Sequence, residues 1–296
     1  MKNRYVLNDS DAQKYNALLR GCPRRYYPGS NLCIMRLIID FLYNNNHEVS
    51  VVNPSCISAF ARSKLSRHKT NKVDSMIIAE YASKNDLLSY VPKSKALQEL
   101  QDLYRCSQNL KEQYVQTQNY LENKNHLSKS VCSSYNKLAK HIMKEITNIE
   151  LAIDNLLTDN PQLKHQADNM QTIPGIGKIT AVAILAESPD LESFSSARQL
   201  AAYAGLTPKH RTSGTSVRGK TSISKIGSSN LRKALYFPAI VAKTHNPLFK
   251  EFTRKLSGKG KPTKVIIVAI MRKLLHIVFG VIKNKTQFNP ILLLDS

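Results

Sequence analysis

The chain has 296 residues, enough for about two domains. Lys and Arg together number 43 and Asp and Glu 21, so the formal net charge is +22, while hydrophobic residues make up 42%. This composition excludes a collagen, a disulfide-stabilised miniprotein and a bundle of membrane-spanning helices, and the excess of positive charge favours a polyanionic partner.

The cysteines favour a reducing compartment, and the apolar segments favour a protein that does not span a membrane. The five cysteines include no Cys-x-x-Cys pair, which argues against a zinc or disulfide framework. The N-terminus lacks the apolar run of a signal peptide. The most apolar stretch, 265–282, is interrupted by Arg272, Lys273 and His276, so we expect a core helix there. The sequence predicts a cytoplasmic protein with no membrane partner, and a basic helix on a membrane surface is the alternative.

Residues 1–92 are predicted to form an α/β domain. A strongly apolar helix is expected at 32–42 and a buried strand at 48–52. The Asn-Pro-Ser segment at 53–55 indicates a turn and the start of a helix, and a further helix is expected at 72–84. One strand cannot form a sheet by itself, so part of the sheet is expected to be missing.

Residues 93–168 are predicted to form long helices, because apolar residues recur at spacings of three and four and glycine is absent. The first pattern runs from Leu100 to Leu121, with the polar Ser107 and Thr117 at its skipped positions. The second comprises Ile142, Ile146, Ile149, Ile153 and Leu156. Two antiparallel helices within the chain and a dimeric coiled coil both fit this pattern.

Residues 169–296 carry most of the positive charge. Between Gly205 and Lys285 there are 18 Lys or Arg residues and a single acid, Glu251. Charges so poorly balanced repel one another unless a polyanion neutralises them, so we expect this region to contact nucleic acid.

Two glycines, Gly175 and Gly177, flank one aliphatic residue just before an apolar run that begins at Ile179. Glycine permits close approach of the backbone, and free N–H groups at a helix start can bind a phosphate with help from Lys178. The pattern is similar to the hairpin of helix-hairpin-helix DNA-binding modules. Such a contact would recognise the DNA backbone and not the base sequence. A tight turn between helices is the alternative.

Ser213 lies in a loop rich in glycine and basic residues. A serine hydroxyl needs a base or strong charge stabilisation to act as a nucleophile, and neighbouring cations can stabilise a phosphoryl transition state. The residues alone favour a hydroxyl that contacts phosphate over a nucleophile. The basic residues expected to contact DNA here are Arg211, Arg218, Lys220, Lys225, Arg232 and Lys233.

Asn71 and Asp74 are three residues apart and therefore share one face of the expected helix. Two carboxylates at this spacing could hold a divalent cation, which prefers oxygen ligands. Since position 71 is Asn, the residues alone favour an N-cap at Asn71 and a first-turn acid at Asp74.

Together these segments resemble the DEDD-type transposases of bacterial insertion sequences, the IS110 family related to the Piv DNA invertase. The resemblance covers nearly the whole chain and implies a ribonuclease-H-like (RuvC-like) domain at 1–92, a helical coiled-coil connector at 93–168 and a helical C-terminal transposase domain at 169–296 with a helix-hairpin-helix-like turn. The segments that match are 47–54, 69–74, 173–177, 203–208, 213–214 and 223–232.

The same resemblance implies a function and a set of site residues. Members of the family recombine DNA with four metal-binding acids, which hold Mg²⁺, and a nucleophilic serine. By motif position, Ser213 matches the serine and Asp74 the last acid. The implied partners are the insertion-sequence ends and target DNA, a guide RNA in several members, and further copies of the chain.

Three of the four acids do not match. No strand of the kind that carries the first acid precedes Tyr5, and Gly29 and Asn71 stand where the family has the second and third acids. One carboxylate would leave two Mg²⁺ ions with few protein ligands. The sequence therefore indicates an N-terminally truncated transposase with impaired catalysis. The alternatives are a non-catalytic DNA- or RNA-binding remnant that regulates an intact transposase, and a junction binder that uses the turn at 175–177.

Overall fold

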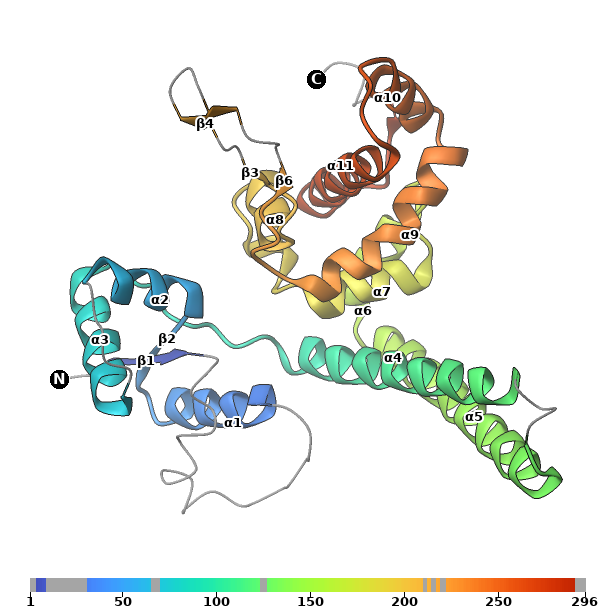
Figure 1. The fold of residues 1–296 in the computed structure, drawn as a ribbon, viewed down its shortest axis with the longest axis horizontal. Helices are drawn as coiled ribbons and strands as arrows, with labels where there is room; N and C mark the ends of the chain where they lie inside the picture. The colour runs from blue at the N-terminus through green and yellow to red at the C-terminus, as the bar shows by residue number, and fades with distance from the viewer. Residues whose placement is uncertain are drawn as a thin grey trace. The chain divides into compact units, whose positions relative to one another are not determined.

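The computed structural model of this chain describes residues 4–8, 31–64, 70–122, 127–209, 212–213, 217–218 and 222–290. Contacts within the chain divide it into two compact units, Met1–Pro92 and Lys93–Ser296. The ribbon in Figure 1 shows the elements of both units.

The N-terminal unit contains a two-stranded parallel sheet in its described residues. Strand β1 (Arg4–Asn8) pairs with β2 (Glu48–Val52), so that Arg4 lies opposite Glu48 and Asn8 opposite Val52. The expected strand at 48–52 is confirmed. The expectation of a lone strand was wrong, because the β-forming run Tyr5-Val6-Leu7 supplies a partner that the sequence analysis overlooked.

Helices α1 (Asn31–Asn44), α2 (Pro54–Ser63) and α3 (Asn71–Lys84) complete this unit and confirm the predicted helices. Asn53 caps α2, since its side chain accepts a hydrogen bond from the Ser55 amide at 2.9 Å. The predicted cap at Asn71 was wrong. The N-cap of α3 is Thr70, whose hydroxyl accepts a hydrogen bond from the Val73 amide at 3.2 Å. Asn71 is the first helical residue. The buried apolar residues described here are Ile38, Ile39, Val49, Ile57 and Ile77.

The C-terminal unit begins with a long helical hairpin. Helices α4 (Lys95–Glu122) and α5 (Lys129–Asp159) run antiparallel and pack along each other (Figure 1). Ser107 and Thr117 are buried at the seam as the pattern predicted. In α5, however, Leu157 is buried and Leu156 is only partly buried. Within one chain, α4 and α5 therefore form the antiparallel pair that the spacing allowed.

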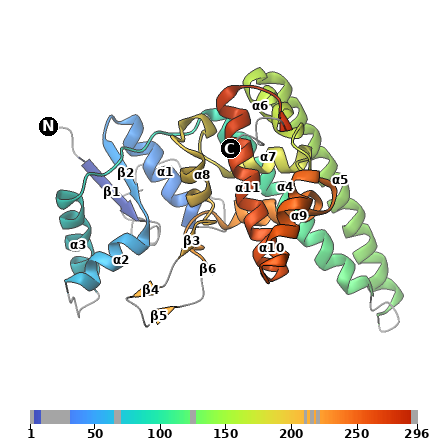
Figure 2. The same cartoon turned by 90° about the horizontal axis from the view of Figure 1, so that it is seen from above.

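Helix α11 (Thr263–Asn284) forms the centre of the remaining bundle and packs against α6, α8, α9 and α10 (Figure 2). Helix α7 contacts α4, α6 and α9 and so joins the hairpin to the bundle. The bounds of the surrounding helices are α6 Pro161–Gln171, α7 Lys178–Glu187, η4 Leu191–Ser193, α8 Ala197–Tyr203, α9 Ser229–His245 and α10 Pro247–Gly258.

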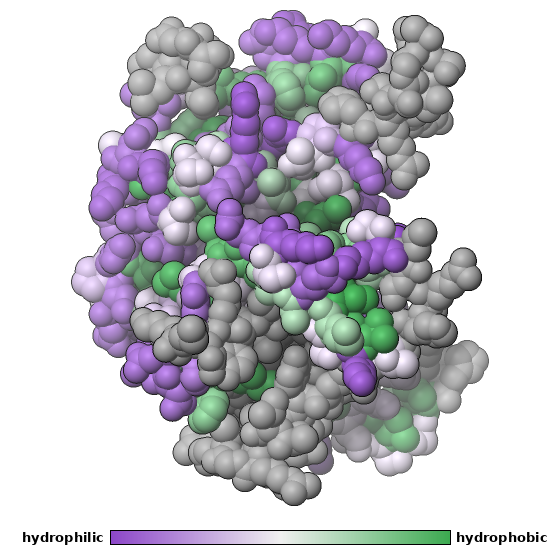
Figure 3. Space-filling view, turned by 90° about the vertical axis from the view of Figure 1, so that its left-hand side faces the viewer, coloured by the Kyte–Doolittle hydropathy of each residue, from purple (hydrophilic) through white to green (hydrophobic). Residues whose placement is uncertain are grey.

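Among the described residues, α11 is also the helix with the length and apolar character to cross a membrane. Its buried residues extend from Ile266 to Ile282 and lie in the core of the bundle, which confirms the predicted core helix. Burial against neighbouring helices is a sufficient physical reason for its hydropathy. Hydrophilic residues cover much of the described surface on the face drawn in Figure 3, with hydrophobic residues in smaller separate areas.

A narrow antiparallel ribbon follows α8. Strand β3 (Pro208–Lys209) pairs with β6 (Ser222–Ile223), and β4 (Thr212–Ser213) pairs with β5 (Val217–Arg218). Both ribbon views show it extending away from the helices of its own unit (Figures 1 and 2). Ser213, which the sequence predicts to lie in a loop, therefore lies in a paired strand.

Candidate functional site

The predicted site residues divide between the two units. Asn71 and Asp74 lie in the first turn of α3 in the N-terminal unit. The predicted serine and the described DNA-contact residues belong to the C-terminal unit. Three predicted positions, Gly29, Arg211 and Lys220, lie outside the described residues.

Ser213 is placed on the β-ribbon. It lies in β4 opposite Val217 of β5, and the neighbouring pair joins Thr212 to Arg218. The backbone pairing therefore brings Arg218 to the rung next to the serine, although five residues separate them in sequence. A serine on a basic, projecting ribbon can reach a polyanion that is too large to enter a cleft.

The base of the ribbon is attached to the end of α8 by backbone hydrogen bonds. The Ser224 amide donates to Thr207 O at 2.9 Å, and the Ser228 amide donates to Tyr203 O at 2.8 Å. Gly227 has a φ of +135°, and a side chain there would collide with Tyr203 O. These contacts fix where the two strands leave the bundle.

Arg232 also stabilises this region. Its Nη1 donates to Ala204 O at 2.8 Å and to Gly227 O at 3.3 Å. The predicted DNA contact at Arg232 is thus a residue whose guanidinium already holds the α8–α9 connection together. Its neighbour Lys233 is exposed, as is Lys225.

The turn between α6 and α7 shows why its glycines differ. Gly175 has a φ of +103°, and a Cβ there would lie 2.9 Å from Ala242 Cβ and 3.1 Å from Pro238 O of α9. This glycine lets the turn pack closely against α9. Gly177 is the N-cap of α7, makes no side-chain cap bond, and has no described heavy atom within 4 Å of where a Cβ would lie.

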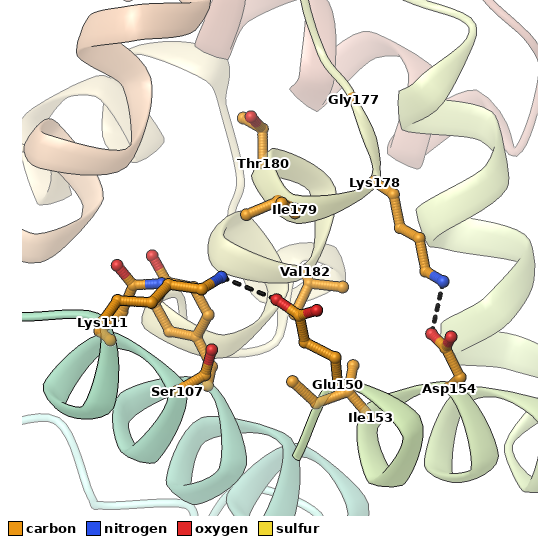
Figure 4. Close-up of a pocket in the computed structure, with 12 residues that line it drawn as sticks. Ser107, Lys111, Glu150, Ile153, Asp154, Gly177, Lys178, Ile179, Thr180 and Val182 are labelled. Atoms are coloured by element: carbon orange, nitrogen blue, oxygen red, sulfur yellow. Dashed lines mark hydrogen bonds and ion pairs between the residues drawn. The ribbon is translucent and has the colours of Figure 1, made fainter. Parts of the chain in front are cut away.

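The start of α7 opens into a cavity of about 470 Å³ between α7 and the α4–α5 hairpin. Lys178 pairs with Asp154 at 2.6 Å and Lys111 with Glu150 at 2.8 Å, as Figure 4 shows. Ser107, with 2% of its surface exposed, also lines this cavity. A phosphate that approaches the α7 N-terminus therefore meets free backbone N–H groups but a lysine already paired with a carboxylate.

A buried ion pair that the sequence analysis missed connects the hairpin to this region. Arg105 of α4 binds Glu187 at the end of α7 through Nε at 2.8 Å and Nη2 at 2.9 Å. The Tyr203 hydroxyl donates to Glu187 O at 3.2 Å, and burial followed by the Glu187 charge raises the pKa of Tyr203. The available signal was one acid, Glu187, at the end of the apolar run in α7.

No cluster of three His, Cys, Asp or Glu side chains suited to a metal ion occurs within the described residues. Asp74 supplies one carboxylate from α3. Asn71 offers a neutral amide and Gly29 no side chain. This donor set does not fit two Mg²⁺ ions, which need several hard oxygen ligands.

Two family models match the chain. One describes the transposases of the IS116/IS110/IS902 family and covers residues 167–254, which include the turn, the ribbon and most of the α9–α10 region. The other describes a DEDD transposase of the IS110 type and covers residues 30–130.

Individual relatives agree with these models. The pilin gene-inverting protein of Moraxella bovis is 38% identical over 247 residues, which cover 83% of this chain and 76% of the relative. The protein of the same name from Moraxella lacunata is 37% identical over the same shares. The transposase for the insertion sequence element IS1328 of Yersinia enterocolitica is 25% identical over 64% of this chain and 62% of its own length.

Proposed function

The chain belongs to the IS116/IS110/IS902 family of insertion-sequence transposases, and we propose that it recombines DNA through a covalent link between DNA and Ser213. Family membership carries the general function, DNA recombination, and DNA as the partner. The position of Ser213 on the basic β-ribbon, inside the segment that the family model covers, supports the specific chemistry.

In the proposed reaction, the Ser213 oxygen attacks a phosphodiester of the insertion-sequence end or its target. An oxygen–phosphorus bond forms at the serine, a DNA hydroxyl leaves, and the proton lost by the serine is balanced by the proton gained by that hydroxyl. Attack by a hydroxyl of the second DNA then restores the serine and joins the strands. Arg211, Arg218 and Lys220, which are near Ser213 in sequence, are proposed to stabilise the phosphoryl charge.

The proposed binding of DNA is electrostatic. The region between Gly205 and Lys285 carries 18 basic residues and one acid, and Lys225 and Lys233 are exposed. Contacts with phosphates release counterions, so binding should weaken steeply as salt rises. Gly177 and Lys178 add a phosphate contact at the α7 N-terminus in this proposal, while Gly175 shapes the turn.

The family implies the use of a divalent metal, but the donors of this chain do not fit two Mg²⁺ ions. Asp74 remains the proposed ligand if one ion is held. A Mg²⁺ ion bound by a single carboxylate keeps mostly water ligands and dissociates readily. Catalysis by this chain is therefore proposed to be impaired.

The proposal retains the three-part organisation. It comprises a ribonuclease-H-like region at 1–92, the connector at 93–168, and a transposase region with a helix-hairpin-helix-like turn at 169–296. The parallel pair β1–β2 with flanking helices supports the first part, and the α4–α5 hairpin supports the second. We also propose that copies of the chain associate through the connector as a coiled coil. A guide RNA as a partner and a cytoplasmic location are further parts of the proposal.

A covalent trap tests the chemistry. Purified protein is incubated with supercoiled DNA carrying the element ends, Mg²⁺ and host RNA, then denatured and examined for protein-linked DNA. Ser213→Ala should abolish the adduct, and Ser222→Ala, an exposed serine of the same ribbon, should not. Equal adducts from wild type and Ser213→Ala would refute the serine assignment.

A non-catalytic nucleic-acid-binding role is the second candidate, favoured by the mismatched acids at Gly29 and Asn71. It predicts salt-dependent DNA retention with no adduct under conditions where an intact relative gives one. An adduct from this chain would reject this second candidate.

A further inference from the structure

Helix α9 presents a row of apolar side chains on its outer face, which we define as Tyr236, Phe237 and Val241. Their exposed fractions are 39%, 73% and 46%, whereas Leu235 and Ala239 on the same helix are fully buried. An aromatic ring left in water forgoes a large burial energy, so a cluster of this kind on a packed helix marks an interaction site.

The charge around this outer face identifies the kind of partner. Helix α9 carries Arg232, Lys233, Lys243 and His245 and no acid. Lys233 lies one turn before Phe237 and is exposed, so the ring has a cation on its own face of the helix. A second copy of the same face would bring no carboxylate to these lysines, whereas a polyanion would neutralise them.

Helix α9 also contacts the α6–α7 turn. Pro238 and Ala242, each next to an outer-face residue, are the residues that Gly175 packs against, at 3.1 Å to Pro238 O and 2.9 Å to Ala242 Cβ. The turn at 172–177 leads directly into the α7 N-terminus, which is the proposed phosphate contact. The turn therefore packs on the buried side of α9, and the outer face lies on the exposed side of the same helix.

We propose that Phe237 is a stacking platform for an unpaired base of the DNA being recombined. Strand exchange leaves nucleotides unpaired, and an aromatic face beside cations binds such bases without regard to sequence. Tyr236 and Phe237 form a T-shaped pair, with ring centroids 5.7 Å apart and planes at 79°, so Tyr236 covers at most one face of the Phe237 ring. This inference rests on the proposed DNA binding by the C-terminal unit.

The test compares two DNA probes with the full-length protein. One is a duplex with a short single-stranded gap containing 2-aminopurine, and the other is the fully paired duplex of the same length. Phe237→Leu removes the ring but keeps an apolar side chain, and Phe237→Tyr keeps the ring. The matched control is Val265→Ala, which changes a 49% exposed apolar residue of α11 outside this face. Because Phe237 is 73% exposed, the variants should melt like the wild type.

The expected result is specific to the gap. Phe237→Leu should weaken binding of the gapped probe about fivefold or more and abolish the 2-aminopurine quench, with less than about a twofold effect on the paired duplex. Phe237→Tyr should bind as wild type, and Val265→Ala should change the binding of neither probe. Equal weakening of both probes, or a quench unaffected by Phe237→Leu, would overturn the proposal.

Two further outcomes would also reject it. A lower molecular mass for Phe237→Leu in light scattering would assign the outer face to a second copy of the chain. A larger Phe237 effect on an RNA strand than on the DNA strand would assign it to RNA. Failure of the wild type to bind any DNA would instead refute the proposed function, so the two failures are distinguishable.

Discussion

The Arg105 guanidinium holds the buried carboxylate of Glu187 through two parallel hydrogen bonds, at 2.8 and 2.9 Å. This pair joins α4 of the hairpin to the last residue of α7, and the Gln101 side chain adds a bond to Ala186 O at 2.8 Å. Through the Tyr203 hydroxyl on Glu187 O, the same region contacts the helix from which the serine-bearing ribbon departs. The orientation of the hairpin and the ribbon base are therefore structurally coupled.

Substitutions of Arg105 and of Glu187 should lower the free energy of unfolding by different amounts. The Glu187 side chain is 2% exposed and that of Arg105 35%. Arg105→Met leaves a buried carboxylate unpaired and should lower the free energy of unfolding by about 3 kcal/mol. Glu187→Gln keeps an acceptor and leaves an arginine that can reach water, so it should cost only about 1 kcal/mol. Urea unfolding followed by circular dichroism measures the free energy of unfolding of both variants. Equal decreases would contradict the view that the buried carboxylate needs its partner more than the arginine does.

Substitutions at the two glycines of the α6–α7 turn should affect different properties, namely stability at Gly175 and DNA affinity at Gly177. Gly175→Ala places a methyl 2.9 Å from Ala242 Cβ at a φ of +103° and should destabilise the protein by about 1–3 kcal/mol. Gly177→Ser has space, and its hydroxyl can cap α7, so stability should hold or rise by about 0.5 kcal/mol. The new cap competes for the N–H groups that the phosphate needs, so DNA affinity should fall. Thermal melts and filter binding test this pair, and stronger binding by Gly177→Ser would exclude the phosphate contact.

Adjacent basic residues on α9 should have different roles. Arg232→Ala removes two charge-assisted hydrogen bonds, to Ala204 O and Gly227 O, and should cost about 1.5–3 kcal/mol of stability. Lys233→Ala removes an exposed cation, so it should leave the melt unchanged, weaken DNA binding at low salt and reduce the salt slope by about one. If Lys233→Ala left that slope as it was, this lysine would not contact phosphate.

His276 should make stability depend on pH. Burial, then the charges of Arg272, Arg198 and Lys273, lower its pKa below the ordinary 6.5, and its Nε2 has no hydrogen-bond partner within the described residues. The unfolded chain therefore binds a proton more readily than the folded one, so stability is complete above pH 6.5 and falls as pH decreases toward the lowered value. His276→Leu should flatten this fall in melts between about pH 7.5 and about pH 5.5. An unchanged profile would show that other groups cause it.

The sequence by itself determined the helices at 32–42 and 72–84, the long helices of 93–168, the core helix at 265–282, the strand at 48–52, most of the seam of the hairpin and the family. Each depends on local periodicity, turn residues or motif order, which are properties of neighbouring positions along the chain. The charge of the region from 205 to 285 was likewise fixed by composition.

Only the tertiary structure decided which residues meet across long separations. It paired Arg105 with Glu187, 82 residues apart, and placed Arg232 against Ala204 O and Gly175 against α9. It also converted the expected Ser213 loop into a paired ribbon and left Phe237 exposed. Such contacts depend on how helix faces pack together, and a periodic pattern states that a face is apolar without stating what covers it.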